Sequence, residues 1–123
     1  MQQSWDKGVE SLPGPVGVKY DDSMTVLKVH LVVMGIKPKT FIHAANTDVH
    51  LKYDDESFSI LLEVFKLNKK TKPPMKTVLE KRYFEMRKCP GKILDINYKL
   101  EKDQCILFVR KSLPGLWSNA LSM

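Results

Sequence analysis

The chain has 123 residues, of which 43% are hydrophobic and 28% charged, a composition typical of one globular domain with its own core. No apolar run approaches the roughly 18 residues of a membrane-crossing helix, and no signal peptide is recognisable, so we expect no membrane partner. The formal net charge is +6, and two cysteines are too few for a disulfide framework, which favours a cytoplasmic location, with the nucleus as the alternative.

The excess positive charge is concentrated in residues 66–88 (KLNKKTKPPMKTVLEKRYFEMRK), which we call the basic segment. It holds nine Lys and Arg against two Glu, a net charge of +7. The rest of the chain holds eleven basic and twelve acidic residues, a net charge of −1. Binding driven by positive charge is therefore expected of the basic segment alone.

Residues 1–15 predict an irregular lead-in that ends at Pro-Gly-Pro. Beyond it, short runs alternate apolar and polar residues, as strands with one face in a core do. Turn signals recur at the spacing of roughly eight to twelve residues that is typical of antiparallel sandwiches. We therefore predict one all-β domain over residues 16–121, an antiparallel β-sandwich of about seven strands. The expected strands are 16–20, 25–34, 40–45, 48–53, 57–65, 93–100 and 104–110.

The basic segment follows neither the period of two of a strand nor the period of 3.6 of a helix. Its first part, residues 66–74, carries two prolines and many lysines and predicts a loop. In residues 77–86, Leu79, Tyr83 and Met86 recur at i, i+4 and i+7, which predicts a short helix on the sandwich. A strand over residues 82–86 is the alternative, because the period of a short apolar run does not decide between the two.

The sequence predicts no enzyme, no cofactor and no metal site. Three histidines are scattered without metal-ligand spacing, and the acidic turn at residues 54–56 lacks the glycine and distal glutamate of a calcium loop. Cys89 stands beside two cations, which would lower the pKa of a thiol, and reactive-thiol chemistry is the minor alternative. The histidines are His30, His43 and His50, and the two cations are Arg87 and Lys88.

The basic segment supplies most of the candidate partner-binding residues. Three interpretations stay open: a solvated loop that protects a sheet edge, a surface for an acidic protein, and a surface for RNA or DNA. Its aromatic pair either anchors the segment on the sandwich or stacks on bases. These candidates are Lys69, Lys70, Lys72, Lys81, Arg82, Tyr83, Phe84, Arg87 and Lys88.

Trp117 is the remaining candidate. It lies in an apolar C-terminal stretch (LPGLWSNAL) and has two interpretations. It either plugs the edge of the sandwich or belongs to a hydrophobic docking surface with Leu113, Leu116 and Leu121.

Four pieces of the sequence resemble the CS domain, a sandwich shared by co-chaperones of the ninety-kilodalton heat-shock chaperone and by nuclear-distribution proteins. They are Tyr20-Asp21 with VLKVHLVVMGIKP, the hairpin DVHLKYDDESFSILLEVF, the closing strand DQCILFVRKS, and the terminal LWSNAL. The resemblance spans residues 16–121. It departs at Asp22, where the family has a tryptophan, and in the basic segment, which reads as an insertion.

The resemblance implies a non-enzymatic protein-interaction module, a co-chaperone or adaptor whose partner is a heat-shock chaperone of the ninety-kilodalton class. The charge of the basic segment favours an acidic protein as the other candidate partner. We expect the chain to be a monomer. CS domains also occur within multidomain proteins, and we expect this chain to be excised from one. RNA binding through the basic segment is the alternative function.

Overall fold

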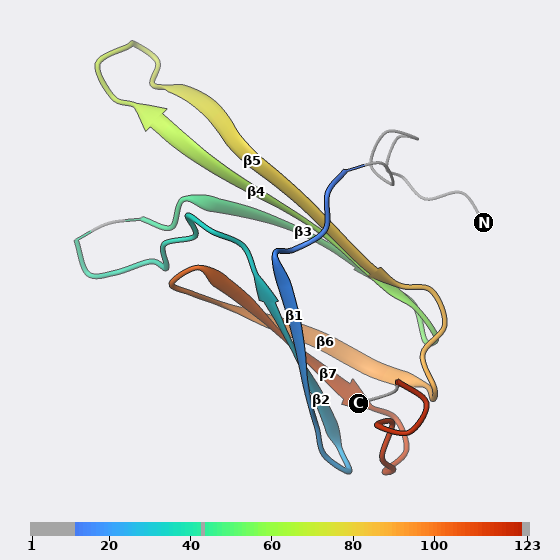
Figure 1. The fold of residues 1–123 in the computed structure, drawn as a ribbon. Coiled ribbons are helices and arrows are strands. Elements are labelled where there is room, and N and C mark those ends of the chain that lie inside the picture. Colours follow the sequence, from blue (N-terminus) through green and yellow to red (C-terminus); the bar gives the residue numbers. More distant parts are fainter. Residues whose placement is uncertain (1–11, 43, 122–123) are drawn as a thin grey trace.

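The computed structural model describes residues 12–42 and 44–121, and within these ranges every regular element is a strand. Two sheets face each other and form a sandwich (Figure 1). One sheet has four strands in the order β1-β2-β7-β6, and the other has three in the order β3-β4-β5, all antiparallel. The strands are β1 (Gly17–Asp22), β2 (Val26–Val32), β3 (Thr47–Tyr53), β4 (Phe58–Asn68), β5 (Met75–Met86), β6 (Ile93–Glu101) and β7 (Gln104–Lys111). The predicted all-β sandwich of seven antiparallel strands is confirmed.

Alternation along the central strands builds the core. Leu27, Val29 and Leu31 of β2 are fully buried, while Lys28 and His30 between them point to the outer face. The same period runs along β7, which pairs with β2 over its whole length. The inner faces of the two sheets therefore meet in one apolar layer, as the sequence pattern predicts.

Residues 40–45 were expected to form a strand, and this prediction is wrong for the described residues among them. They belong to a long loop between β2 and β3. The side chain of Asn46 closes the neck of this loop, because its Oδ1 accepts from Lys37 N at 2.8 Å and its Nδ2 donates to Gly35 O at 2.9 Å. His43 lies outside the described residues, as do residues 1–11 of the lead-in.

The helix predicted over residues 77–86 is also wrong, because these residues form most of β5. β5 pairs with β4 along its full length, and β4 itself continues to Asn68, so the loop predicted over residues 66–74 shrinks to a turn. The register slips between Val64 and Phe65, and Leu79 is the extra residue of the resulting bulge. This bulge breaks the alternation, which is why the sequence showed no clean strand period. The alternative of a strand over residues 82–86 is correct.

Candidate functional site

The cations of the basic segment are spread along the β4–β5 hairpin and do not form one cluster. A strand rises about 3.3 Å per residue, so the 12 residues of β5 separate its two ends by roughly 40 Å. The turn end projects beyond the rest of the sandwich (Figure 1). The predicted residues fall into three groups: Lys69, Lys70 and Lys72 at the turn, Lys81 and Arg82 midway along β5, and Arg87 and Lys88 beyond its other end.

Most cations outside the turn already have acidic partners. The pairs are Lys76 with Asp48, Lys81 Nζ with Glu63 Oε2 at 3.5 Å, Arg82 Nη2 with Glu80 Oε1 at 2.7 Å, and Arg87 Nε with Glu85 Oε1 at 2.7 Å. No carboxylate of the described residues pairs with the lysines of the turn. The uncompensated positive charge of the hairpin therefore sits at its projecting end.

The aromatic pair of β5 is built into the fold. Phe84 points inward and packs against Phe58, with the ring centroids 6.0 Å apart. Tyr83 lies on the opposite face, where it is buried opposite Leu61, and its hydroxyl donates to Glu85 Oε2 at 3.0 Å. Neither ring is presented as a platform for bases, so the geometry favours the anchor interpretation.

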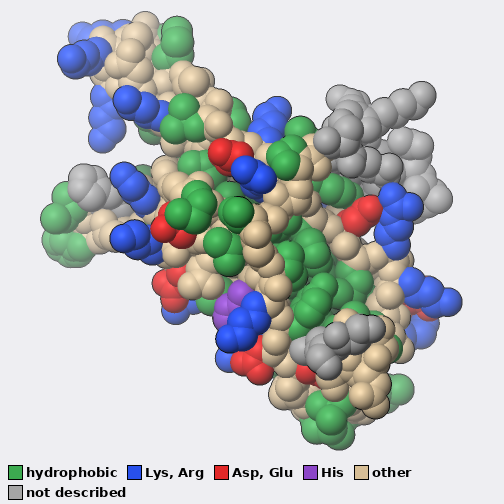
Figure 2. All heavy atoms as spheres, in the orientation of Figure 1, with side chains coloured by type: hydrophobic (Ala, Val, Ile, Leu, Met, Phe, Trp, Pro, Cys, Tyr) green, Lys and Arg blue, Asp and Glu red, His purple; other side chains and the backbone are tan. Residues whose placement is uncertain are grey.

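Exposed apolar side chains accompany the lysines on the hairpin. Leu67 lies next to the end of β4, while Met75, Val78 and Leu79 lie in the first half of β5, and all four are exposed. Figure 2 shows such apolar side chains interspersed with basic ones on the projecting part of the molecule. Apolar groups interspersed with cations form a surface that can bind a partner both by burying apolar area and by attracting negative charge.

β5 is an edge strand of the three-stranded sheet. Among the described residues, Pro13 and Gly14 contact its outer edge, where Tyr83 N donates to Pro13 O at 2.9 Å and Arg82 Nη1 donates to Gly14 O at 3.0 Å. Because backbone groups alternate in direction along an antiparallel strand, the N–H of Lys81 points outward like that of Tyr83. No strand of the described residues pairs with this edge between Met75 and Lys81.

Trp117 is buried, with 5% of its surface exposed, and closes the corner between the two sheets. Its ring lies so close to Gly91 that a Cβ on that glycine would be 3.0 Å from the indole Nε1. Leu113 and Leu116 are exposed, whereas Leu121 packs partly against the core. The burial of Trp117 favours the plug interpretation over a docking surface.

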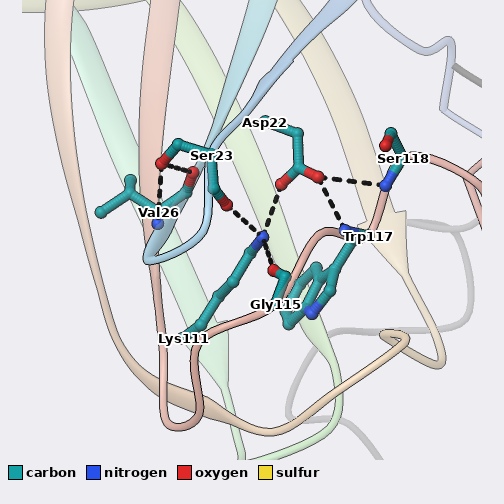
Figure 3. A network of polar contacts seen from close by, with 7 residues as sticks. All are labelled: Asp22, Ser23, Val26, Lys111, Gly115, Trp117 and Ser118. Atoms are coloured by element: carbon teal, nitrogen blue, oxygen red, sulfur yellow. Dashed lines mark hydrogen bonds and ion pairs between the residues drawn. The ribbon is translucent and has the colours of Figure 1, made fainter.

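A buried ion pair holds this corner in place (Figure 3). The Lys111 ammonium lies 2.6 Å from Asp22 Oδ1, and the two side chains are 0% and 3% exposed. The ammonium also donates to the carbonyls of Ser23 and Gly115, at 2.5 Å each, and lies 5.0 Å from the centre of the Trp117 ring. Three protein oxygens and an aromatic face therefore solvate the charge that burial removes from water.

The Asp22 carboxylate has partners of its own. Its Oδ2 accepts from the backbone N–H groups of Trp117 at 2.7 Å and Ser118 at 3.0 Å. Burial acts to raise the pKa of Asp22, but the hydrogen bonds from Lys111 and from these two N–H groups outweigh it, and the pKa lies below its ordinary value. Asp22 therefore anchors the segment that carries Trp117.

The two cysteines are free and buried. Burial raises the pKa of Cys89 to about 11, with a further increase from the charge of Asp54, and burial raises the pKa of Cys105 to about 12. The expectation that Arg87 and Lys88 lower the pKa of Cys89 is therefore wrong, because desolvation of the thiolate dominates.

The hairpin between β3 and β4 brings together three side chains that the sequence analysis did not combine. Ligand atoms of Asp48, His50 and Glu63 lie within 4.8 Å of one another on the outer face of the sheet. Lys76 pairs with Asp48, and Lys81 pairs with Glu63. A metal ion would have to displace both ammonium groups, so we assign this group as a network of ion pairs.

Residues 12–42 and 44–121 contain no helix that is long and apolar enough to cross a membrane. No protein-family model, no curated protein and no solved structure matches this chain.

Proposed function

We propose that this chain is a non-enzymatic, CS-like interaction module that docks an acidic protein segment along the outer edge of β5. The observation that carries the proposal is the composition of this edge. Unpaired backbone groups between Met75 and Lys81 run beside exposed apolar side chains and beside the lysines of the hairpin turn. An extended peptide can add to such an edge as a further strand.

The charge of the hairpin defines the partner. Lys69, Lys70 and Lys72 have no acidic partner among the described residues, so a segment rich in Asp and Glu gains attraction there. Val78 and Leu79 offer apolar contacts on the same stretch, which favours a partner that alternates acidic and apolar residues. The resemblance to the CS domain adds a partner class, the ninety-kilodalton heat-shock chaperone.

The backbone of Lys81 provides the sharpest test. Lys81→Pro removes an N–H that points away from β4, so it blocks strand addition while the pairing with β4 is kept. Lys81→Ala is the matched control, since it removes the same charge and keeps the N–H. Capture of the purified ninety-kilodalton chaperone, and of proteins from cell extract, is measured on the immobilised wild type and both variants.

We expect capture by the wild type and by Lys81→Ala but not by Lys81→Pro. Equal capture by all three would show that the β5 edge is not the docking site. The RNA alternative is tested by titrating the chain with single-stranded RNA at several salt concentrations. Salt-sensitive RNA binding without capture of a protein would overturn the proposal.

A further inference from the structure

Two projections leave the sandwich at the same end. One is the turn of the β4–β5 hairpin, and the other is the loop between β2 and β3, residues 33–46. β4 runs past the start of β3 there, and Phe65 N donates to Asn46 O at 2.9 Å, which places the neck of the loop beside the base of the hairpin extension. Figure 1 shows both projections pointing away from the body on one side.

The loop presents apolar side chains to water. Phe41 is fully exposed and Ile42 is 81% exposed. The base of the loop is fixed, since Ile36 is buried in the core and the Asn46 side chain bridges the neck. An exposed aromatic and an exposed β-branched residue side by side on an anchored loop gain free energy only when something apolar covers them.

Both projections carry lysines. Residues 33–47 and 64–79 contain no Asp or Glu, and they hold Lys37, Lys39, Lys66, Lys69, Lys70, Lys72 and Lys76. Only Lys76 pairs with a carboxylate of the described residues, that of Asp48. The nearby Asp103 lies at the base of the loop, where its carboxylate accepts from Gly35 N at 2.8 Å. Figure 2 shows blue and green side chains together on both projections.

From this arrangement we infer that the chain binds peripherally to an anionic lipid bilayer. Phe41 and Ile42 enter the interfacial region, and the lysines of both projections contact the anionic headgroups. This revises the expectation of no membrane partner, which rested on the lack of a spanning segment. It does not rest on the proposed protein docking, which uses the edge of β5 and shares with the bilayer only the lysines of the hairpin turn.

Two observations favour a bilayer over RNA or a protein groove. Single-stranded RNA could contact the lysines and stack a base on Phe41, but it would leave Ile42 in water. A protein groove would bind the apolar side chains of one loop. Here two separate projections at one end both carry apolar side chains among lysines. A bilayer surface is wide enough to meet both, and its acyl layer receives the apolar tips.

Co-sedimentation with phosphatidylcholine vesicles, with and without phosphatidylserine, tests the inference on the full chain. The variants are Phe41→Ser/Ile42→Ser for the apolar tip, and Lys37→Glu/Lys39→Glu and Lys69→Glu/Lys70→Glu for the charge. The matched controls, Leu113→Ser and Lys88→Glu, change an exposed leucine and an exposed lysine at the opposite end of the sandwich.

We expect binding only to vesicles that contain phosphatidylserine, weakened by salt. Loss of the apolar tip should weaken it about ten-fold or more, and each lysine removed should weaken it about five-fold. The control variants should bind like the wild type. Phe41→Trp supplies a direct readout, because its fluorescence should shift to the blue on binding and be quenched by brominated lipid.

Three results would overturn the inference: no binding to anionic vesicles, unchanged binding by Phe41→Ser/Ile42→Ser, or no quenching of Phe41→Trp. Tight RNA binding that is insensitive to Phe41→Ser/Ile42→Ser, without vesicle binding, would assign the lysines to nucleic acid instead. Lys81→Pro separates the two surfaces, since it should abolish capture of the protein partner and leave vesicle binding intact. Failure of either proposal is therefore visible independently of the other.

Discussion

Lys111 and Asp22 form a buried ion pair, 2.6 Å apart, that joins the end of β7 to the end of β1. The same carboxylate holds the backbone of Trp117, and the same ammonium holds the carbonyl of Gly115. One pair of charges therefore fixes the path of the chain after β7 and seats the tryptophan that closes the sandwich.

Asp22→Asn should strongly destabilise the fold, because it leaves the Lys111 ammonium buried without its counter-charge. Breaking a buried pair on one side costs about 3–5 kcal/mol of unfolding free energy, which urea denaturation followed by circular dichroism can measure. Asp22→Asn/Lys111→Met should recover part of this loss. The exposed pair of Lys92 and Asp55 is the control, and Lys92→Met should change stability little. Equal effects of the two single variants would contradict the assigned role of the buried pair.

The stability of the fold should fall in acid through the same carboxylate. The pKa of Asp22 in the folded chain lies below its ordinary value, so the group adds stability above the unfolded pKa of about 3.9. This contribution is lost as the pH falls through the folded pKa. Denaturation midpoints measured from neutral pH down to acid should fall less steeply for Asp22→Asn/Lys111→Met than for the wild type. Parallel profiles would show that other carboxylates, such as Asp54 and Asp95, carry the acid sensitivity.

Gly91→Ala should disturb the seat of Trp117. The new methyl group would lie 3.0 Å from the indole Nε1, closer than ordinary packing allows. Overpacking of this kind costs about 1–3 kcal/mol, and the displaced indole should show red-shifted fluorescence in a Trp5→Phe background. Gly17→Ala is the control, since its Cβ would meet only Val32, at an ordinary 3.6 Å. An unshifted spectrum for Gly91→Ala would mean that the corner adjusts without moving the ring.

Much of the sandwich could be predicted from alternation, because strands such as β2 and β7 keep one strictly apolar face. The same period places Lys111 on the core face of β7, after Cys105, Leu107 and Val109. A lysine on that face indicates a buried counter-ion. Nothing local to Lys111 identifies Asp22 as the partner, because the pair forms only when β1 and β7 are placed on either side of β2.

The full length of β5 could not be predicted from the sequence, for a physical reason. Its pattern is interrupted at Leu79 by the bulge. Its neighbouring aromatic residues point to opposite faces, where Tyr83 is buried and Phe84 is partly buried against the core. Near Tyr83 both faces of β5 are covered, whereas its projecting end is exposed. The sequence of such a strand shows neither a regular alternation of apolar and polar residues nor a continuous apolar run. The strand predicted over residues 40–45 fails because the apolar side chains of Phe41 and Ile42 lie on an exposed loop and not in the core.

The thiols of Cys89 and Cys105 should resist alkylation in the folded chain. Their pKa values are raised by burial to about 11 and about 12, so the thiolate fraction at neutral pH is minute. Iodoacetamide labelling followed by mass spectrometry should show slow modification in buffer and rapid modification in urea. Rapid labelling of Cys89 in the folded chain at neutral pH would contradict this and would support a reactive thiol at Cys89.

The projecting end of the hairpin should be removable without loss of the fold. Leu67 and Lys76 are directly paired, so an Asn-Gly turn in place of residues 68–75 keeps the register of β4 and β5. None of the removed residues belongs to the core, and we expect the unfolding free energy to change by less than about 1 kcal/mol. The shortened chain loses Lys69, Lys70 and Lys72 together, so vesicle binding and capture of an acidic partner should both weaken. If binding to vesicles and to protein survives in a shortened chain of unchanged stability, the lysines of the turn only keep the edge of the sheet soluble, as the solvated-loop interpretation holds.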